Sequence, residues 1–122
     1  MGDRAHVYVT AGEESGVWLY SHWGGRSLPG TVASALARGA RWDDPPYLTR
    51  IIFSEMIKED VMGETGYGIS ATPTDMGDGG RVVCVDIQAG TVHLRTNSGV
   101  GKTYRFQEFV DEKPGWGVMD EQ

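Results

Sequence analysis

The chain has 122 residues, 39% of them hydrophobic and 23% charged, and its formal net charge is −6. This length and composition predict one globular domain with a core of its own and exclude an intrinsically disordered chain. The negative charge argues against generic nucleic-acid binding, because neutralising phosphates requires a basic surface.

Compartment and redox state are predicted from what the sequence lacks. The residues at the start of the chain have no apolar segment of the kind that secretion signals contain. No apolar run approaches the ~18 residues that span a bilayer. We therefore expect a cytoplasmic protein that does not bind membranes. Cys84 is the only cysteine, which excludes an internal disulfide, and its valine-rich surroundings predict a buried, unreactive thiol.

The first predicted element is a β-hairpin. Residues 6–10 predict one strand and residues 17–23 its partner, because aromatic and β-branched residues alternate on both sides of a glycine-containing turn. Alternation along the second strand places Trp18, Tyr20 and His22 on one face. The other face is expected to carry Val17, Leu19, Ser21 and Trp23.

A helix is predicted next, from residue 28 to about residue 38. Ser27 is in the position to cap it, and Gly39 is a natural C-terminal stop.

A second helix is predicted to begin after Asp43 or Asp44, either of which can cap it, and to fade near Met62. Its apolar residues recur with the helical spacing i, i+3, i+4 and i+8, which places them on one face. They are Leu48, Ile51, Ile52 and Met56.

The remainder of the chain is predicted to be β-structure. Strands are expected over 67–72, 81–88, 91–96 and 102–110, separated by glycine-rich turns. The residues from 111 to 122 are expected to be a loose acidic tail, apart from Trp116. The order ββααββββ predicts a single α+β domain over residues 1–122, with a mostly antiparallel sheet of about six strands and two helices on one face. A small curled barrel is the alternative.

Three motifs of known chemistry fail on inspection. Residues 98–103 end like a phosphate-binding loop, but the first glycine of that motif is missing and a strand follows, so we predict a hairpin turn. Residues 75–80 lack the oxygen ligands of a calcium loop, so we predict a turn. His6, His22 and His93 have no short metal-ligand spacing. We therefore assign no catalytic residue, no metal and no cofactor.

The strongest candidate for a ligand site is the run Tyr20 to Gly25. Tyr20, His22 and Trp23 have rings that stack and polar tips, and Gly24 and Gly25 let a ligand approach the backbone. The competing interpretation is a sheet face that helices cover, with the glycines serving only the turn.

Two further places carry basic residues suited to an anionic ligand. Arg41 and Trp42 can together hold a flat anion, although a helix cap with a packed tryptophan explains them equally. Arg50 follows on the second predicted helix. We assign Arg41, Trp42 and Arg50 to the same predicted site as the run Tyr20 to Gly25.

The combined pattern of the sequence resembles a family of small uncharacterised proteins from tailed phages and their actinobacterial or archaeal hosts. The resemblance covers about residues 6–88 and implies no activity, cofactor or catalytic residue. It implies a phage or mobile-element setting, in which small proteins often block a host defence component or sequester its nucleotide signal. The matching residues are Tyr20-x-His22-Trp23-Gly24-Gly25, Ala35-Leu36-x-Arg38-Gly39, Arg41-Trp42-Asp43, Tyr47-Leu48-x-Arg50-Ile51-Ile52-Phe53 and Thr65-Gly66-x-Gly68-Ile69-Ser70.

These observations lead to three hypotheses on function. The first is a non-enzymatic binding protein that captures a nucleotide-like anionic small molecule, with subunits of a homo-oligomer sharing the site. The second is an inhibitor or accessory module that acts on a host protein through exposed aromatic residues, with Trp116 as an anchor. The third is a small hydrolase that uses His22 for acid–base chemistry.

Overall fold

The structure is a computed structural model that describes residues 2–12, 16–73, 80–97 and 101–120, with side chains up to Val118. Its strands are β1 (Ala5–Thr10), β2 (Val17–Ser21), β3 (Tyr67–Ser70), β4 (Val82–Asp86), β5 (Thr91–Arg95) and β6 (Gly101–Arg105). Its helices are α1 (Leu28–Leu36), α2 (Pro45–Ile57) and α3 (Phe106–Glu112), with 3-10 turns η1 (Gly25–Ser27) and η2 (Trp116–Asp120).

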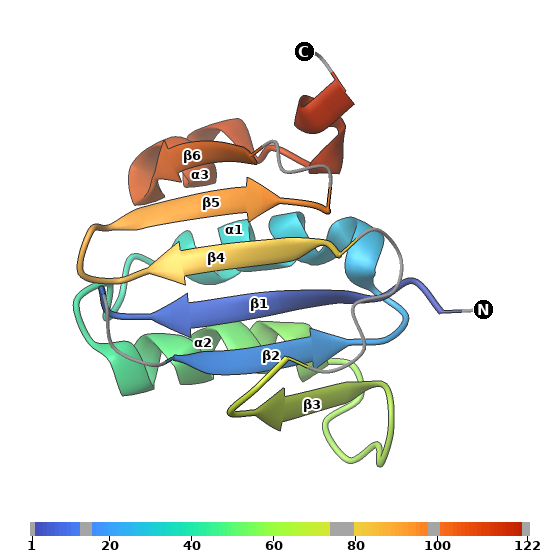
Figure 1. Ribbon diagram of the computed structural model, residues 1–122. Coiled ribbons are helices and arrows are strands. Elements are labelled where there is room, and N and C mark those ends of the chain that lie inside the picture. The colour runs from blue at the N-terminus through green and yellow to red at the C-terminus, as the bar shows by residue number, and fades with distance from the viewer. Residues whose placement is uncertain (1, 13–15, 74–79, 98–100, 121–122) are drawn as a thin grey trace.

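The six strands form one open sheet in the order β3-β2-β1-β4-β5-β6. All neighbours are antiparallel except β1 and β4, which run parallel in the middle of the sheet. The three helices lie on the same side of the sheet (Figure 1). The predicted α+β class with helices on one face is confirmed. The barrel is not formed, because β3 and β6 remain at opposite edges.

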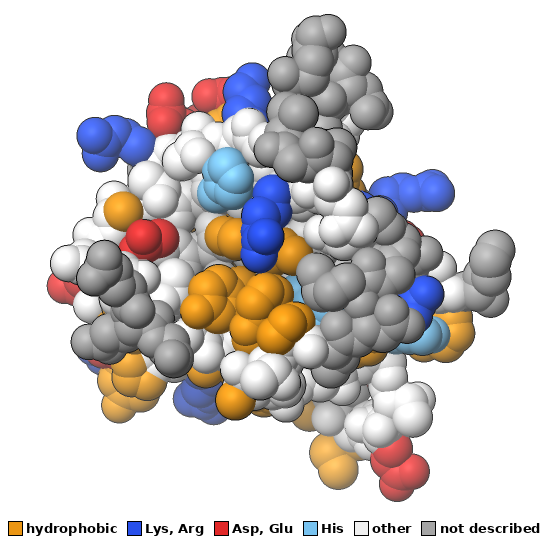
Figure 2. Space-filling view, viewed as in Figure 1, with side chains coloured by type: hydrophobic (Ala, Val, Ile, Leu, Met, Phe, Trp, Pro, Cys, Tyr) orange, Lys and Arg blue, Asp and Glu red, His pale blue; other side chains and the backbone are white. Residues whose placement is uncertain are grey.

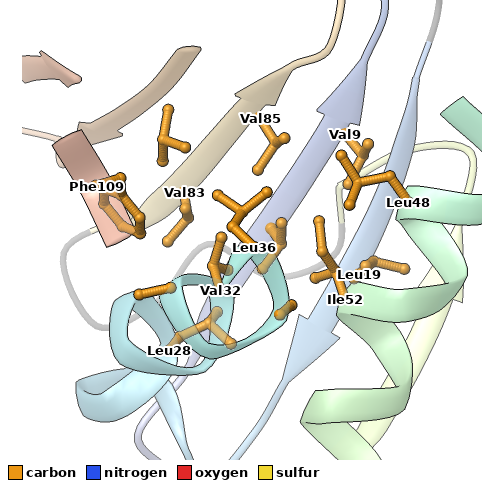
Figure 3. Close-up of a cluster of buried hydrophobic side chains, with 14 of the residues drawn as sticks. Val9, Leu19, Leu28, Val32, Leu36, Leu48, Ile52, Val83, Val85 and Phe109 are labelled. Atoms are coloured by element: carbon orange, nitrogen blue, oxygen red, sulfur yellow. The ribbon is translucent and has the colours of Figure 1, made fainter. Parts of the chain in front are cut away.

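The core lies between the sheet and the helices. Alternate residues of the strands point toward the helices, which is the two-residue period expected of a sheet with one covered face. Figure 3 shows aliphatic side chains of α1 and α2, with Phe109 of α3, gathered against the valines of the sheet. The buried members of this core from the strands are Ala5, Val7, Val9, Leu19, Val83, Val85, Val92, Leu94 and Tyr104.

The two predicted helices are present, but each ends earlier in the sequence than predicted. The Ser27 hydroxyl donates to the Gly24 carbonyl at 3.3 Å and does not cap α1. Gly39 ends that turn with a left-handed φ of 67°, which glycine adopts without strain. Asp44 is the cap of α2, since its Oδ1 accepts from the Tyr47 N–H at 3.3 Å. The helix ends at Ile57 and does not reach Met62.

The predicted strand over 102–110 is wrong in its second half. The strand ends at Arg105, and α3 begins at Phe106. The Glu108 carboxylate accepts from the Arg105 N–H at 2.8 Å and so starts the helix. Phe106 and Phe109, three residues apart, then reach the core from one side of that helix.

The predicted loose tail is also wrong within the described residues. Residues 111 and 112 belong to α3, and a 3-10 turn covers Trp116–Asp120. The Trp116 indole N–H donates to the Gly25 carbonyl at 2.8 Å, and its ring packs against the core. Trp116 is therefore a structural contact and not the free anchor for a partner that the second hypothesis required.

Three smaller predictions have mixed outcomes. Cys84 is half-buried on the face away from the helices, so the prediction of a buried thiol is wrong. The interiors of the two rejected motifs, residues 75–79 and 98–100, lie outside the described residues. Lys102 and Thr103 belong to β6, as the prediction of a strand after that turn requires. Among the described residues, no helix is long and apolar enough to cross a membrane.

Candidate functional site

Six rings form a continuous row across β1, β2 and the turn after β2, on the face of the sheet opposite the helices. We call it the aromatic row. In order of contact its members are Tyr8, Trp18, His6, Tyr20, His22 and Trp23.

The row follows from strand alternation. His6 pairs with Tyr20 and Tyr8 with Trp18 across the antiparallel β1–β2 ladder, so these four side chains stand on one face. The predicted grouping of Trp18, Tyr20 and His22 on one side is confirmed by the contact of Tyr20 with His22. The prediction that Trp23 lies on the other face is wrong, because β2 ends at Ser21 and Trp23 lies in the turn, where its ring contacts His22. No described helix covers this face, which contradicts the competing interpretation that helices cover these rings.

The contacts within the row are close and varied in geometry. Tyr8 and Trp18 are stacked, with centroids 4.4 Å apart and planes at 29°. His6 meets the edge of Trp18 at 5.4 Å. At the other end, the rings of His22 and Trp23 are perpendicular at 4.2 Å. Each such pair contributes roughly 0.5–1.5 kcal/mol beyond the contribution from its buried area, so the contacts between the rings stabilise their arrangement in the row.

The exposure of the row increases from its middle to its end. His6 is buried between the rings of Trp18 and Tyr20, and this burial lowers the pKa of His6 below its usual value, so the imidazole is neutral at pH 7. Tyr8, Trp18 and Tyr20 are half-buried, whereas Trp23 is 60% exposed. The row therefore has a fixed base and accessible rings.

The hydroxyl of Tyr20 and Nδ1 of His22 lie 2.6 Å apart, which is a short hydrogen bond. This contact orients the imidazole, whose other nitrogen lies beside Gly2 of the N-terminal segment. No described carboxylate bonds to His22, so the described residues do not supply the acidic partner that acid–base catalysis often uses.

Next to the row, the same face carries Cys84 and Arg95. Cys84 pairs with Tyr8 across β1 and β4, and the Arg95 Nε donates to the Cys84 sulfur at 3.4 Å. Arg95 is exposed and makes no ion pair with a described residue. Figure 2 looks onto this face, where a continuous hydrophobic patch lies over the middle strands with a basic side chain and a histidine beside it.

His93 stands on the same face, farther from the row. Its Nδ1 lies 2.7 Å from the Thr103 hydroxyl. Partial burial and then the charge of Arg95 lower the pKa of His93 below its usual value. Arg95 is therefore the cationic group that this part of the face presents at neutral pH.

Gly24 and Gly25 serve the turn after β2. The Gly24 N–H donates to the Ser21 hydroxyl at 3.1 Å, and the Gly25 N–H donates to the Asp3 carbonyl at 2.7 Å. Gly25 is buried, and a Cβ there would meet the Asp3 carbonyl at 2.5 Å. Glycine is thus required by the approach of the chain's own N-terminal segment, and a ligand does not reach this backbone.

Arg41 and Trp42 lie far from the aromatic row. The Trp42 indole donates to the Leu36 carbonyl at 3.0 Å and packs edge-on against Phe106. The Arg41 guanidinium lies 4.8 Å from the centre of the Tyr47 ring. This is the packed tryptophan beside a helix cap that the sequence offered as the competing interpretation of these two residues.

The topology explains the separation. Gly25 contacts the segment that leads into β1, whereas Trp42 lines a hollow with Gly90, which follows β4. Because β1 and β4 are parallel, the start of one and the end of the other lie at opposite ends of the sheet. Arg50 lies on α2, behind the sheet. The structure thus unites Tyr20, His22 and Trp23 but does not bring Arg41, Trp42 or Arg50 to them.

The residues that complete the row were not identified from the sequence. Tyr8 and Trp18 lie in strands that the sequence predicted, and Trp18 was placed on the correct face. The available signal was the matching alternation of the two hairpin strands, which pairs Tyr8 with Trp18 once the register is known. Arg95 and Cys84 join the face only through the parallel pairing of β1 with β4, which leaves no local sequence signal.

Among the described residues, no three histidine, cysteine or acidic side chains come together as metal ligands would. Comparisons with known protein families, with curated proteins and with solved structures found no match.

Proposed function

We propose that the chain is a non-enzymatic binding protein that takes up a small, flat, anionic ligand of nucleotide type on the uncovered face of its sheet. The observation that carries the proposal is the aromatic row, with its accessible rings on a face that no described helix covers. Core packing does not require rings there, because the core lies on the other face.

Stacking supplies the affinity in this proposal. Every nucleobase has a flat π-face, and stacking one base on an aromatic side chain contributes roughly 1–3 kcal/mol. The stacked pair of Tyr8 and Trp18 lies beside Cys84 on this face, and both rings are partly exposed. Trp18 has the larger ring of the pair and is the residue expected to contribute most.

Arg95 supplies the anion contact. A guanidinium has five N–H donors in a planar fork that suits phosphate oxygens, and the contact with Cys84 uses only Nε. In this proposal Arg95 takes the role that the sequence assigned to Arg41 and Arg50. The net charge of −6 favours a small anion over a long polyanion.

The resemblance to phage proteins suggests the biological setting. A protein that binds a nucleotide tightly without converting it lowers the free concentration of that nucleotide. In a phage, this would be a counter-defence role in which the ligand is a host signal. The stacking face supports this form of the hypothesis over one that depends on turnover.

The test is a thermal-shift screen with linear and cyclic nucleotides, followed by calorimetry on any hit. A ligand at 100 times its Kd stabilises the folded state by about 2.7 kcal/mol, which raises the Tm by several degrees. Trp18→Leu and Arg95→Gln should each weaken binding about tenfold or more, while Arg41→Gln, the matched control, leaves it unchanged. Loss of binding in Arg41→Gln but not in the other two variants would overturn the proposal.

Native mass spectrometry of the complex separates capture from turnover. The proposal predicts a bound ligand of unaltered mass that stays intact during long incubation. A product that accumulates with time would favour the hydrolase hypothesis, and His22→Ala would then identify whether that imidazole takes part.

A further inference from the structure

The two edges of the sheet differ in how they are protected. Edge strands expose unpaired N–H and C=O groups, and proteins commonly guard them with charged side chains. β6 carries Lys102 and Arg105, whereas β3 reads Tyr-Gly-Ile-Ser and has no charge. No described residue pairs with the outer edge of β3. This edge is therefore open to another strand.

Apolar side chains gather beside this open edge. A groove of about 730 Å³ runs between α2 and β3 on the helix side of the sheet, and Val17, Phe53, Ile57, Val61 and Ile69 line it. Val61 and Ile69 are 61% and 63% exposed and line the same groove, and exposed apolar residues that gather in one place are typical of an interface.

The same surface carries unpaired charges of both signs. Arg50 lines the groove and makes no ion pair with a described residue. Glu59, Asp60 and Glu64, in the segment between α2 and β3, are exposed and likewise make none. Arg38 and Lys58 also line the groove but bind Glu55, so the unpaired cation lies in the first half of α2 and the unpaired carboxylates lie beyond its last turn. Such a surface is complementary to itself.

We propose that two copies of the chain pair through the outer edges of β3. A two-fold axis perpendicular to the sheet makes the two β3 strands antiparallel and joins the two sheets into one. Ile69 and Val61 of each copy then lie over the junction, where they bury apolar surface that is exposed in the single chain.

The register shows which charges meet. The Tyr67 end of β3 follows the acidic segment, and the Ser70 end lies beside Trp18 of β2. The first turn of α2 lies at that second end, since Val17, Pro46 and Thr49 line one hollow. The two-fold axis therefore brings the acidic segment of one copy toward the first half of α2 in the other, which carries Arg50.

The test is sedimentation velocity and light scattering of the full chain over a wide range of concentration. The wild type should be a dimer that dissociates on dilution. Ile69→Lys should raise the dimer dissociation constant at least tenfold, because it places a charge in the apolar junction and on the open edge. Gln107→Lys, at an exposed residue of α3 beside the opposite edge of the sheet, is the matched control and should leave the dimer intact. A monomeric wild type, or equal effects of both variants, would overturn the proposal.

A charge exchange tests the orientation and does not depend on whether Ile69→Lys folds well. Arg50→Glu and Glu64→Lys should each weaken the dimer, and the double variant should recover most of the loss. Failure of the double variant to recover would exclude this two-fold arrangement. Circular dichroism of each variant confirms that the domain is folded. The aromatic row lies on the opposite face of the sheet, so nucleotide binding and dimerisation can fail independently.

Discussion

The helix-covered face of the sheet and its uncovered face carry different kinds of side chain, which serve different purposes. The covered face presents valines and leucines that three helices bury completely. The uncovered face presents rings that touch one another in a row, and all of them except His6 are at least partly exposed. Aliphatic side chains fill a core at high density, whereas rings with polar tips keep a surface that remains useful in water. Stability is therefore expected to depend mainly on the first face and recognition on the second.

The largest effect should come from the covered face. Leu36 is fully buried between α1 and the sheet, so Leu36→Ala removes buried methyl groups and leaves a cavity. We expect a loss of about 2–5 kcal/mol in the free energy of unfolding, measured by urea denaturation. The nucleotide preference of the folded fraction should not change. A loss below about 1 kcal/mol would contradict the division between the two faces.

The corresponding change on the uncovered face is Trp18→Leu. It removes the stacked contact with Tyr8 but opens no closed cavity, so the expected cost is about 1 kcal/mol by the same denaturation experiment. Ligand affinity should fall at the same time, as proposed above. If this variant is less stable than Leu36→Ala, the uncovered face is part of the core and the comparison fails.

A smaller effect is expected at the ion cluster that joins the two longer helices. Glu55 of α2 accepts hydrogen bonds from Arg38, at the end of α1, and from Lys58. The Arg38 bond, helped by Lys58, holds the pKa of Glu55 below its usual range. Stability from this group is therefore present above the unfolded pKa of about 4.3 and is lost as pH falls through the folded value.

Glu55→Gln should cost about 0.2–1 kcal/mol at pH 7, because both cations are largely exposed. It should also reduce the loss of stability that the wild type suffers under acid. Denaturation curves at neutral and acid pH measure both effects. Glu59→Gln changes an exposed carboxylate outside the cluster and is the matched control. An equal effect of this variant on stability would show that the ion pairs of Glu55 do not cause the loss of stability in acid.

The smallest expected effect is a pH dependence on the uncovered face. Burial lowers the pKa of His6, so the unfolded chain binds a proton that the folded chain rejects. Stability is therefore complete above the unfolded value of about 6.5 and falls as pH drops toward the lower folded value. His6→Phe should flatten the stability curve between about pH 7.5 and 5. Glu55→Gln should keep the wild-type slope in that window, since the pKa of the Glu55 carboxyl that it removes lies below this pH range.

The fold could be predicted largely because its elements are local in sequence. The β1–β2 hairpin and the stripe of α2 are visible as periods of two and 3.6 residues, and both are present. The segment after Arg105 was misassigned because Tyr104 and Phe106 alternate like strand residues. The capping contact of Glu108 with the Arg105 N–H and the burial of Phe106 and Phe109 from one side favour a helix there.

The candidate site was predictable only in part, for a topological reason. Tyr20, His22 and Trp23 are neighbours in sequence, so their proximity required no knowledge of strand order. Whether Arg41 could reach them depended on which ends of β1 and β4 lie together, and a pairing between distant strands leaves no periodic signal. The same pairing brings Arg95 to the row. The sequence therefore failed to identify Arg95 and wrongly assigned Arg41 for the same reason.

The parallel pairing of β1 with β4 also bears on the order in which the chain folds. The hairpin pairings join strands that follow one another closely, and the β2–β3 pairing stays within residues 17–70, whereas this one joins His6 to Val82 and Thr10 to Asp86 across most of the chain. Closing so long a loop is slow and costs chain entropy, so we expect the two halves to form first and to meet at this pairing last. Tyr8 lies on one side of that junction and Cys84 on the other. A ligand that contacts both residues would then stabilise the pairing of β1 with β4. The amide hydrogens of these two strands would exchange more slowly in its presence.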